Sequence, residues 1–221
     1  AWHSTFSSYL LSIGFTNSRC DSSLFIQRTS TTVTFLLIYV DDILITGNSV
    51  AHITSLIHHM HKTFSMKELG DISYFLRISV ARIASDLFLS QHKYATDILL
   101  KAGMINCKPC SSPMASKSEP PSDTLVPFSQ PSLYRSIVGA LQYLTITKPD
   151  ISFAVNHAYQ FMHAPTIAYF NTVKQLLRYI QGTLHHGLLI TPGSLDLQAF
   201  SDSDGAAMFL IINLPLSIVA F

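Results

Sequence analysis

The pair Asp41-Asp42 lies between two apolar, β-branched runs, and this arrangement restricts the local fold more than any other stretch of the chain. Thr34–Val40 has the composition of a buried strand, and Ile43–Thr46 that of a strand returning beside it. Together they predict a β-hairpin with the two carboxylates at its tip. An exposed Asp-Asp turn is the alternative, because Asp is a favoured turn residue. The apolar neighbours and the late first glycine, Gly47, favour the half-buried arrangement.

Carboxylates pressed between apolar residues need a compensating cation. No Lys or Arg lies between Arg28 and Lys62, so a divalent metal is the simplest compensation. Carboxylate oxygens and substrate phosphates are the usual ligands of Mg²⁺, and two such ions can stabilise the attacking and leaving oxygens of phosphoryl transfer. We therefore expect Asp41 and Asp42 to be at least half-buried and to bind metal.

Apolar periodicity along the rest of the chain predicts an α+β fold with an antiparallel sheet. In the first half we expect helices at residues 2–13, 49–64 and 91–102, strands at 24–26 and 34–39, and a hairpin at 74–81 and 86–89. Residues 107–132 are rich in Pro and Ser and predict an extended linker. After it we expect helices at 134–144, 151–162 and 166–181, and residues 186–190 and 197–201 could open a new sheet.

The composition excludes several classes of protein. A net charge of +1 gives no overall basic field, so binding to nucleic acid would depend on local patches. The first residues lack a signal peptide, no apolar run spans a bilayer, and three Cys do not make a disulfide scaffold. We expect an intracellular protein that is not secreted and has no membrane partner.

The residues around the Asp pair resemble a known family. Tyr39-Val40-Asp41-Asp42 is similar to the Tyr-x-Asp-Asp box of reverse transcriptases, in the version found in copia-type LTR retrotransposons. Further blocks follow in the order of the family, so the resemblance covers roughly residues 1–204; these blocks lie at 64–76, 89–99, 104–109, 134–144, 148–156, 173–184 and 199–204.

The resemblance implies part of a Pol polyprotein with a partial reverse-transcriptase palm, whose antiparallel sheet and β-hairpin carry Asp-Asp, followed by a helical thumb and connection region. We expect five segments: a partial palm and thumb at 1–106, the linker at 107–132, a helical connection at 133–192, the start of an RNase H-like domain at 193–204, and an unrelated apolar tail at 205–221.

The resemblance also implies the roles of individual residues. Asp41 and Asp42 would be the catalytic, metal-binding pair, with Mg²⁺ (or Mn²⁺) as cofactor, and Tyr39 and Val40 would pack beneath the primer terminus. In the family, the segment matching Tyr74, Phe75 and Leu76 helps position the primer end. The family usually has Gly where this chain has Arg77, so a long cation replaces a position open to close backbone approach.

Four cations on predicted helices, Lys93, Lys101, Lys174 and Arg178, could contact phosphates or could equally lie on solvated faces. Asp202 aligns with the first metal-binding carboxylate of a family RNase H domain. No carboxylate follows Asp204, so RNase H activity is not expected from this sequence.

The family supplies a further metal ligand and a nucleotide-binding block from residues that would precede Ala1. Asp21 aligns after that block and is not the further ligand. We therefore expect an RNA-directed DNA polymerase fragment, with primer–template RNA/DNA and dNTP as partners, that is impaired or inactive alone. The alternatives are a nucleic-acid-binding remnant without catalysis and a nonfunctional product of a decayed element.

Overall fold

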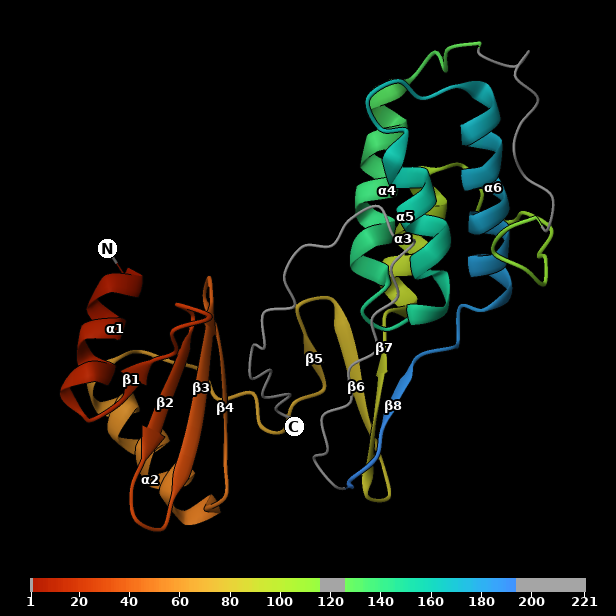
Figure 1. Cartoon of the computed structure of the whole chain (residues 1–221). Helices are drawn as coiled ribbons and strands as arrows, with labels where there is room; N and C mark the ends of the chain where they lie inside the picture. Colours follow the sequence, from red (N-terminus) through yellow and green to blue (C-terminus); the bar gives the residue numbers. More distant parts are fainter. Residues whose placement is uncertain (1, 116–125, 194–221) are drawn as a thin grey trace, which may run out of the picture. The chain divides into compact units, whose positions relative to one another are not determined.

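The computed structural model describes residues 2–115 and 126–193, and its residues form two compact units that divide after Ile72. Each unit combines a four-stranded antiparallel sheet with helices, so the predicted α+β class with antiparallel pairing is confirmed. Figure 1 shows the first unit from red to orange and the second from yellow to blue. No helix in the described ranges has the length and apolarity needed to cross a bilayer.

The first unit places two helices against one face of its sheet. In chain order its elements are α1 (Trp2–Ser12), β1 (Thr16–Asn17), β2 (Leu24–Arg28), β3 (Val33–Tyr39), β4 (Asp42–Gly47) and α2 (Val50–Thr63), and the strand order is β1-β2-β3-β4. The helix predicted at 2–13 is confirmed, and Gly14, with φ +92°, ends it. The helix predicted after Asn48 is also confirmed, with the Ser49 hydroxyl accepting from the His52 amide at 3.3 Å.

The core of the first unit follows the two-residue period of β3. Thr34, Leu36 and Ile38 are buried, while the residues between them are only partly covered. Leu36 and Ile38 pack with Phe25 of β2 and with apolar side chains of both helices; these are Phe6, Leu10, Leu56 and Met60. The helices therefore cover one face of the sheet and fix the register of β3.

The second unit begins with a sheet ordered β5-β6-β7-β8. Its strands are β5 (Tyr74–Phe75), β6 (Ile78–Ile83), β7 (Asp86–Ser90) and β8 (Leu188–Ile190). Two expectations need correction. The strand predicted at 74–81 is two strands, because the chain reverses at Leu76-Arg77. Residues 186–190 do not open a new sheet, since β8 pairs with β7 and completes this one; residues 197–201 lie outside the described residues.

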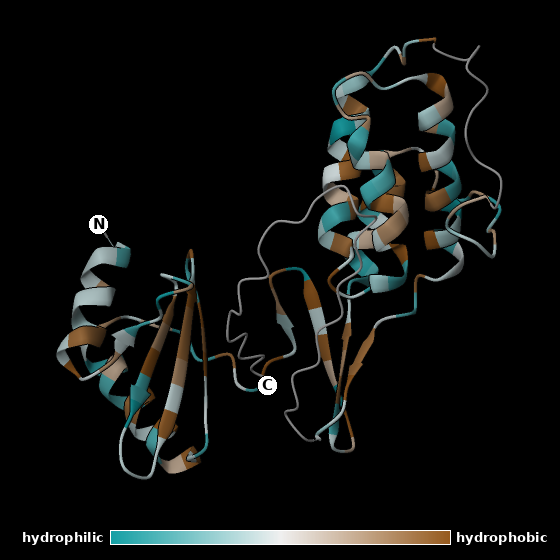
Figure 2. Ribbon diagram, in the orientation of Figure 1, coloured by the Kyte–Doolittle hydropathy of each residue, from teal (hydrophilic) through white to brown (hydrophobic). Residues whose placement is uncertain are grey.

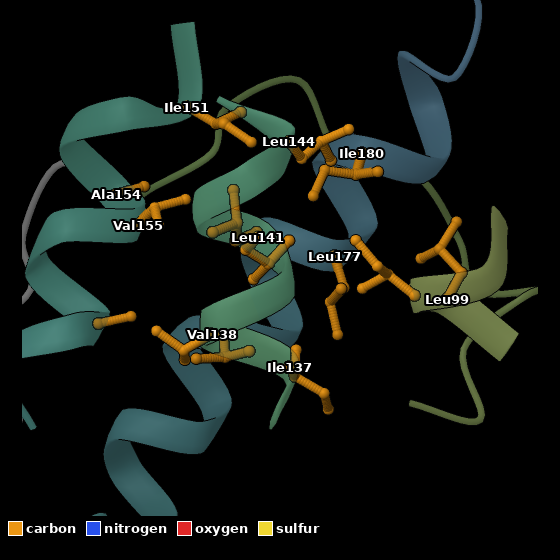
Figure 3. Packing of buried hydrophobic residues seen from close by; sticks show 14 of the residues in the cluster. Leu99, Ile137, Val138, Leu141, Leu144, Ile151, Ala154, Val155, Leu177 and Ile180 are labelled. Carbon is orange, nitrogen blue, oxygen red and sulfur yellow. The ribbon is translucent and has the colours of Figure 1, made fainter. Parts of the chain in front are cut away.

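The helices of the second unit share one core. They are α3 (His92–Lys101), α4 (Pro131–Leu144), α5 (Ser152–Gln160) and α6 (Ile167–Gly182), with a short 3-10 turn, η1 (Pro149–Ile151), before α5. All four predicted helices are confirmed. Figure 3 shows Leu99 of α3, Leu141 of α4, Val155 of α5 and Leu177 of α6 directed into the same interior, and all are fully buried. Figure 2 shows that hydrophobic residues also run along the strands.

A buried lysine contacts the C-terminal end of α6 in this helical core. Lys148 is almost completely buried, and its ammonium group donates to the carbonyl of Thr183 at the end of α6. A cation at a helix C-terminus is favourable because the last carbonyls carry partial negative charge. Burial nevertheless lowers the pKa of Lys148, and the nearby charge of Asp150 opposes that shift.

The part of the predicted linker that the structure describes lies against α6. The Arg178 guanidinium donates to the carbonyl of Lys108 at 2.7 Å, and the Cys110 amide donates to the carbonyl of Arg178 at 3.4 Å. After residues 116–125, which are not described, Pro127 pairs with Thr166 and Phe128 stacks on Phe170, with ring centroids 4.1 Å apart. Both ends of the linker are therefore attached to the second unit.

The packing of α4 predicts a large cost for truncating its central side chain. Leu141→Ala should lower the free energy of unfolding of the second unit by about 2–5 kcal/mol, because Leu141 is fully buried and leaves a cavity. Urea unfolding measures the loss. The control is Leu100→Ala on α3: this side chain is 66% exposed, and its loss should cost less than about 0.5 kcal/mol. Equal costs for the two variants would contradict this packing.

The hydrogen bond of Tyr179 on α6 predicts a loss of stability at alkaline pH. The Tyr179 hydroxyl donates to the Asp150 carboxylate at 2.6 Å, and this bond, with burial and the charge of Asp150, raises the pKa of Tyr179 to about 12. Above about pH 10 an unfolded tyrosine ionises while folded Tyr179 keeps its proton. The contribution of Tyr179 is therefore complete below that pH and is lost as pH rises toward 12.

Tyr179→Phe should consequently be less stable than the wild type near neutral pH, and the difference should shrink as pH rises above about 10. Urea unfolding of both proteins across this range measures it. Asp150→Asn removes the charge and should also reduce the pH dependence that Tyr179 contributes. A difference between wild type and Tyr179→Phe that stays constant across the range would count against the hydrogen bond.

Candidate metal-binding hairpin

The strands β3 and β4 bring Asp41 and Asp42 to the end of a tight hairpin. Tyr39 faces Asp42 as the last residue pair of the ladder, so Val40 and Asp41 alone form the loop. Behind the loop, Ile38 faces Ile43 and Leu36 faces Ile45. Because Leu36 and Ile38 are fixed in the core, the register places this consecutive pair of carboxylates at the tip.

The loop has an unusual backbone conformation. Val40 has φ +54°, in the left-handed region, which a β-branched residue rarely adopts. Two-residue hairpin loops need positive φ at their first position, or at both, so that the turn matches the twist of the strands. Gly or Asn usually supplies it, whereas here Val40 does so at some cost in backbone strain.

The carboxylates are exposed, which corrects the expectation that they are at least half-buried. Asp41 and Asp42 both lie on the surface, as do Tyr39, with 52% of its side chain exposed, and Val40, with 73%. The run before the loop is buried at alternate residues and the run after it is partly covered, whereas the loop residues themselves are exposed. Burial therefore does not by itself demand a cation at this pair.

The chemistry of the pair still suits a hard divalent cation. Two adjacent carboxylates offer only oxygen ligands, which Mg²⁺ prefers, and their exposure leaves room for water and phosphate oxygens. Across residues 2–115 and 126–193, no set of three or more His, Cys, Asp or Glu side chains is arranged to hold a metal ion. Any metal ion at the hairpin would therefore take only part of its coordination shell from these two carboxylates.

The residues predicted to position a primer lie on two separate units. Tyr39 and Val40 stand beside the carboxylates on the first unit. Tyr74 and Phe75 form β5 of the second unit, and Leu76 opens the turn that follows. Tyr74 is 53% exposed, whereas Phe75 and Leu76 are half-buried.

Arg77 does not leave an open position at this turn. Its φ is +62°, which explains physically why Gly suits the position, and its guanidinium lies 5.3 Å from the centroid of the Tyr94 ring. The contact with Tyr94 could not be predicted from the sequence, because a helical pattern does not indicate which side chains the helix meets. Burial raises the pKa of Tyr94, and the positive charge of Arg77 works against that shift.

The four cations predicted to contact phosphates are on the helices of the second unit. Lys93 and Lys101 lie on α3, and Lys101 bonds to the Ser136 hydroxyl. Lys174 and Arg178 lie on α6, where Lys174 stands over the Phe170 ring at 5.0 Å and Arg178 bonds to the linker. Their contact with phosphate stays a prediction. Asp202 lies outside the described residues.

The strained loop generates a prediction about stability. Val40→Asn should raise the free energy of unfolding of the first unit by about 1 kcal/mol, because Asn tolerates positive φ and the exposed Val side chain loses little packing. Chemical denaturation measures the gain. Val50→Asn is the matched control, since Val50 is 81% exposed at the start of α2 without positive φ, and its effect should stay within about 0.5 kcal/mol. A loss of stability in Val40→Asn would contradict the strained loop.

Comparison with known proteins gives the same family that the hairpin sequence resembles. The family described as reverse transcriptase (RNA-dependent DNA polymerase) matches residues 1–116. The chain is 53% identical over 173 residues to an uncharacterized mitochondrial protein of Arabidopsis thaliana, covering 78% of this chain and 72% of that protein. No solved structure matches the chain.

Longer relatives come from plant transposons. The chain is 42% identical over 207 residues to the retrovirus-related Pol polyprotein from transposon RE2 of Arabidopsis thaliana, covering 93% of this chain but 14% of the polyprotein. It is 32% identical over 215 residues to the Pol polyprotein from transposon TNT 1-94 of Nicotiana tabacum, covering 93% of this chain and 16% of that polyprotein. The chain belongs to the reverse transcriptase family, within the Pol polyproteins of copia-type retrotransposons.

Proposed function

We propose that the chain contributes the metal-binding hairpin, thumb and connection of an RNA-directed DNA polymerase, which adds deoxynucleotides to a primer 3′-hydroxyl on an RNA or DNA template inside the cell. The observation that carries the proposal is the hairpin itself: the register of β3 and β4 holds two adjacent, exposed carboxylates at the tip of a sheet in a chain of this family. Residues 1–106 would form part of the palm and the thumb, and residues 133–192 the connection.

Within this proposal, Asp41 and Asp42 would hold Mg²⁺ or Mn²⁺. Asp41 is assigned as the direct ligand and Asp42 as the weaker or outer one. A metal ion held there would supply positive charge to the attacking hydroxyl and the leaving pyrophosphate. The exposure of both carboxylates supports this role, because water and phosphate oxygens must complete the shell of six ligands that Mg²⁺ prefers.

The neighbouring residues are assigned to the primer. Tyr39 and Val40 are exposed beside the carboxylates, where an apolar and aromatic surface can pack under a terminal nucleotide. Tyr74 offers a second exposed ring on the other unit. The helical cations of the second unit are assigned to the phosphate backbone, which cations bind without reading sequence.

We further propose that the polypeptide of residues 1–221 extends primers poorly by itself. Two Mg²⁺ ions carry four positive charges, and the described residues offer them two neighbouring carboxylates but no group of three or more His, Cys, Asp or Glu side chains. The family resemblance assigns a further carboxylate to a strand outside these residues. Binding of primer–template without catalysis is the second candidate, and the exposed Tyr39, Val40 and Tyr74 favour it because they require no metal.

Primer extension by purified 1–221 tests the proposal. With Mg²⁺ or Mn²⁺ and dNTPs, we expect binding of a primer–template duplex that weakens steeply with salt, and extension close to background. Asp41→Asn should not weaken duplex binding, because it removes a negative charge near the nucleic acid. Addition in trans of the preceding segment of a related Pol polyprotein should raise extension, and this gain should be lost in Asp41→Asn.

Two results would contradict the proposal in different ways. Efficient metal-dependent extension by 1–221 alone, abolished in Asp41→Asn, would show that the chain is a complete polymerase. Absence of duplex binding at low salt would exclude both the polymerase role and the binding role, and would favour a nonfunctional product of a decayed element. The matched control is Asp86→Asn, which removes a carboxylate from another hairpin, between β6 and β7, and should change neither result.

A further inference from the structure

The turn between β5 and β6 is held in a conformation that its own residues disfavour. Phe75 faces Ile78, so Leu76 and Arg77 form a two-residue loop. Both have positive φ, +48° and +62°, a combination that hairpins normally assign to Asn-Gly or Gly-Gly. Backbone in this region persists in non-glycine residues only when the surrounding structure determines it.

Two tyrosines from distant helices determine this turn. The Tyr143 hydroxyl of α4 donates to the backbone carbonyl of Leu76. The Tyr94 ring of α3 lies under the Arg77 guanidinium at 5.3 Å, and the Tyr94 and Tyr143 rings meet edge to face with centroids 5.4 Å apart. One loop residue is therefore held by its carbonyl and the other by its side chain.

The turn needs this support because β5 is short and lies at the edge of its sheet. Only Tyr74 and Phe75 pair with β6, and a two-residue strand contributes little stability by itself. By contrast, α3 and α4 belong to the buried helical core. Through Tyr94 and Tyr143, the packed helices therefore restrain the edge hairpin.

We propose that Tyr143 and Tyr94 are positioning residues that hold the β5–β6 turn so that the exposed ring of Tyr74 meets the 3′ end of a bound primer strand. This inference rests on the proposed function for its ligand. The two positioning residues lie on helices that follow Tyr74 in the sequence. Arg77 also makes a contact that Gly could not make, because its guanidinium lies over the Tyr94 ring.

Tyr143→Phe tests the role, because it removes the hydroxyl and keeps the ring that meets Tyr94. The full 221-residue chain is first followed by hydrogen exchange without nucleic acid. Amides of residues 74–79 should exchange several-fold faster in the variant, while those of α3, α4 and α6 keep their wild-type rates. The matched control is Tyr159→Phe on α5, a tyrosine that is 51% exposed, which should leave residues 74–79 unchanged.

The second measurement uses a primer–template duplex with a photoreactive nucleotide at the primer 3′ end. In the wild type we expect cross-links to residues 73–79. In Tyr143→Phe their yield should fall several-fold, while the affinity for the duplex, which depends mainly on phosphate contacts, stays close to that of the wild type. Tyr159→Phe should cross-link as the wild type does.

The outcomes separate this inference from the proposed function. Unchanged exchange at residues 74–79 in Tyr143→Phe, or faster exchange throughout the second unit, would overturn the positioning role whether or not the duplex binds. Unchanged cross-links in a variant with faster exchange would overturn the link to the primer. Failure of the wild-type chain to bind the duplex would instead contradict the proposed function, and with it the assignment of a primer to Tyr74.

Discussion

The register of β3 against β4 is the constraint on which the candidate site depends. Leu36 and Ile38 are fixed beneath the two helices of the first unit, and their cross-strand partners are Ile45 and Ile43. A slip by one residue would turn every β3 side chain to the opposite face and expose the buried set. The cost of that exposure places the loop at Val40-Asp41, and with it both carboxylates at the tip of the hairpin. The position of the polar pair is thus determined by apolar contacts that lie behind it.

The two-residue hairpin loops in the described part of the chain lack the Gly and Asn residues that usually supply positive φ in a turn. Three loops of two residues connect strands in the described ranges, at Val40-Asp41, Leu76-Arg77 and Ala84-Ser85, and each begins with a non-glycine residue at positive φ. The second was not predicted, because Leu-Arg inside an apolar run carries none of the residues that indicate a turn. Val40 adopts the required φ only because the register on both sides is already fixed. At Val40 the strand register overrides local preference, and at Leu76-Arg77 the contacts with Tyr143 and Tyr94 do so.

Most helices, by contrast, could be predicted from the sequence, since the 3.6-residue period of α4 and α6 records their burial directly. The pairing of β8 with β7 was not predictable from any local pattern. It joins residues about a hundred positions apart and depends on close approach at Gly187, where a Cβ atom would collide with the carbonyl of Leu89. The contacts of Tyr143 with Leu76 and of Arg77 with Tyr94 could likewise not be predicted from any local pattern. Periodicity reveals which face is buried but not what it meets.

The exposure of Asp41 and Asp42 changes how metal binding relates to folding. A buried pair would be costly without a cation, so the hairpin would fold only as metal bound. An exposed pair pays no such desolvation penalty, and the register is maintained by apolar contacts alone. The apolar contacts therefore allow the hairpin to fold without metal, and under the proposed function the pair would bind a metal ion only weakly, since two carboxylates leave most of the preferred six positions open. If the proposed function holds, oxygens from a nucleotide and a primer would complete the shell, so metal binding would depend on the presence of substrate rather than on the fold.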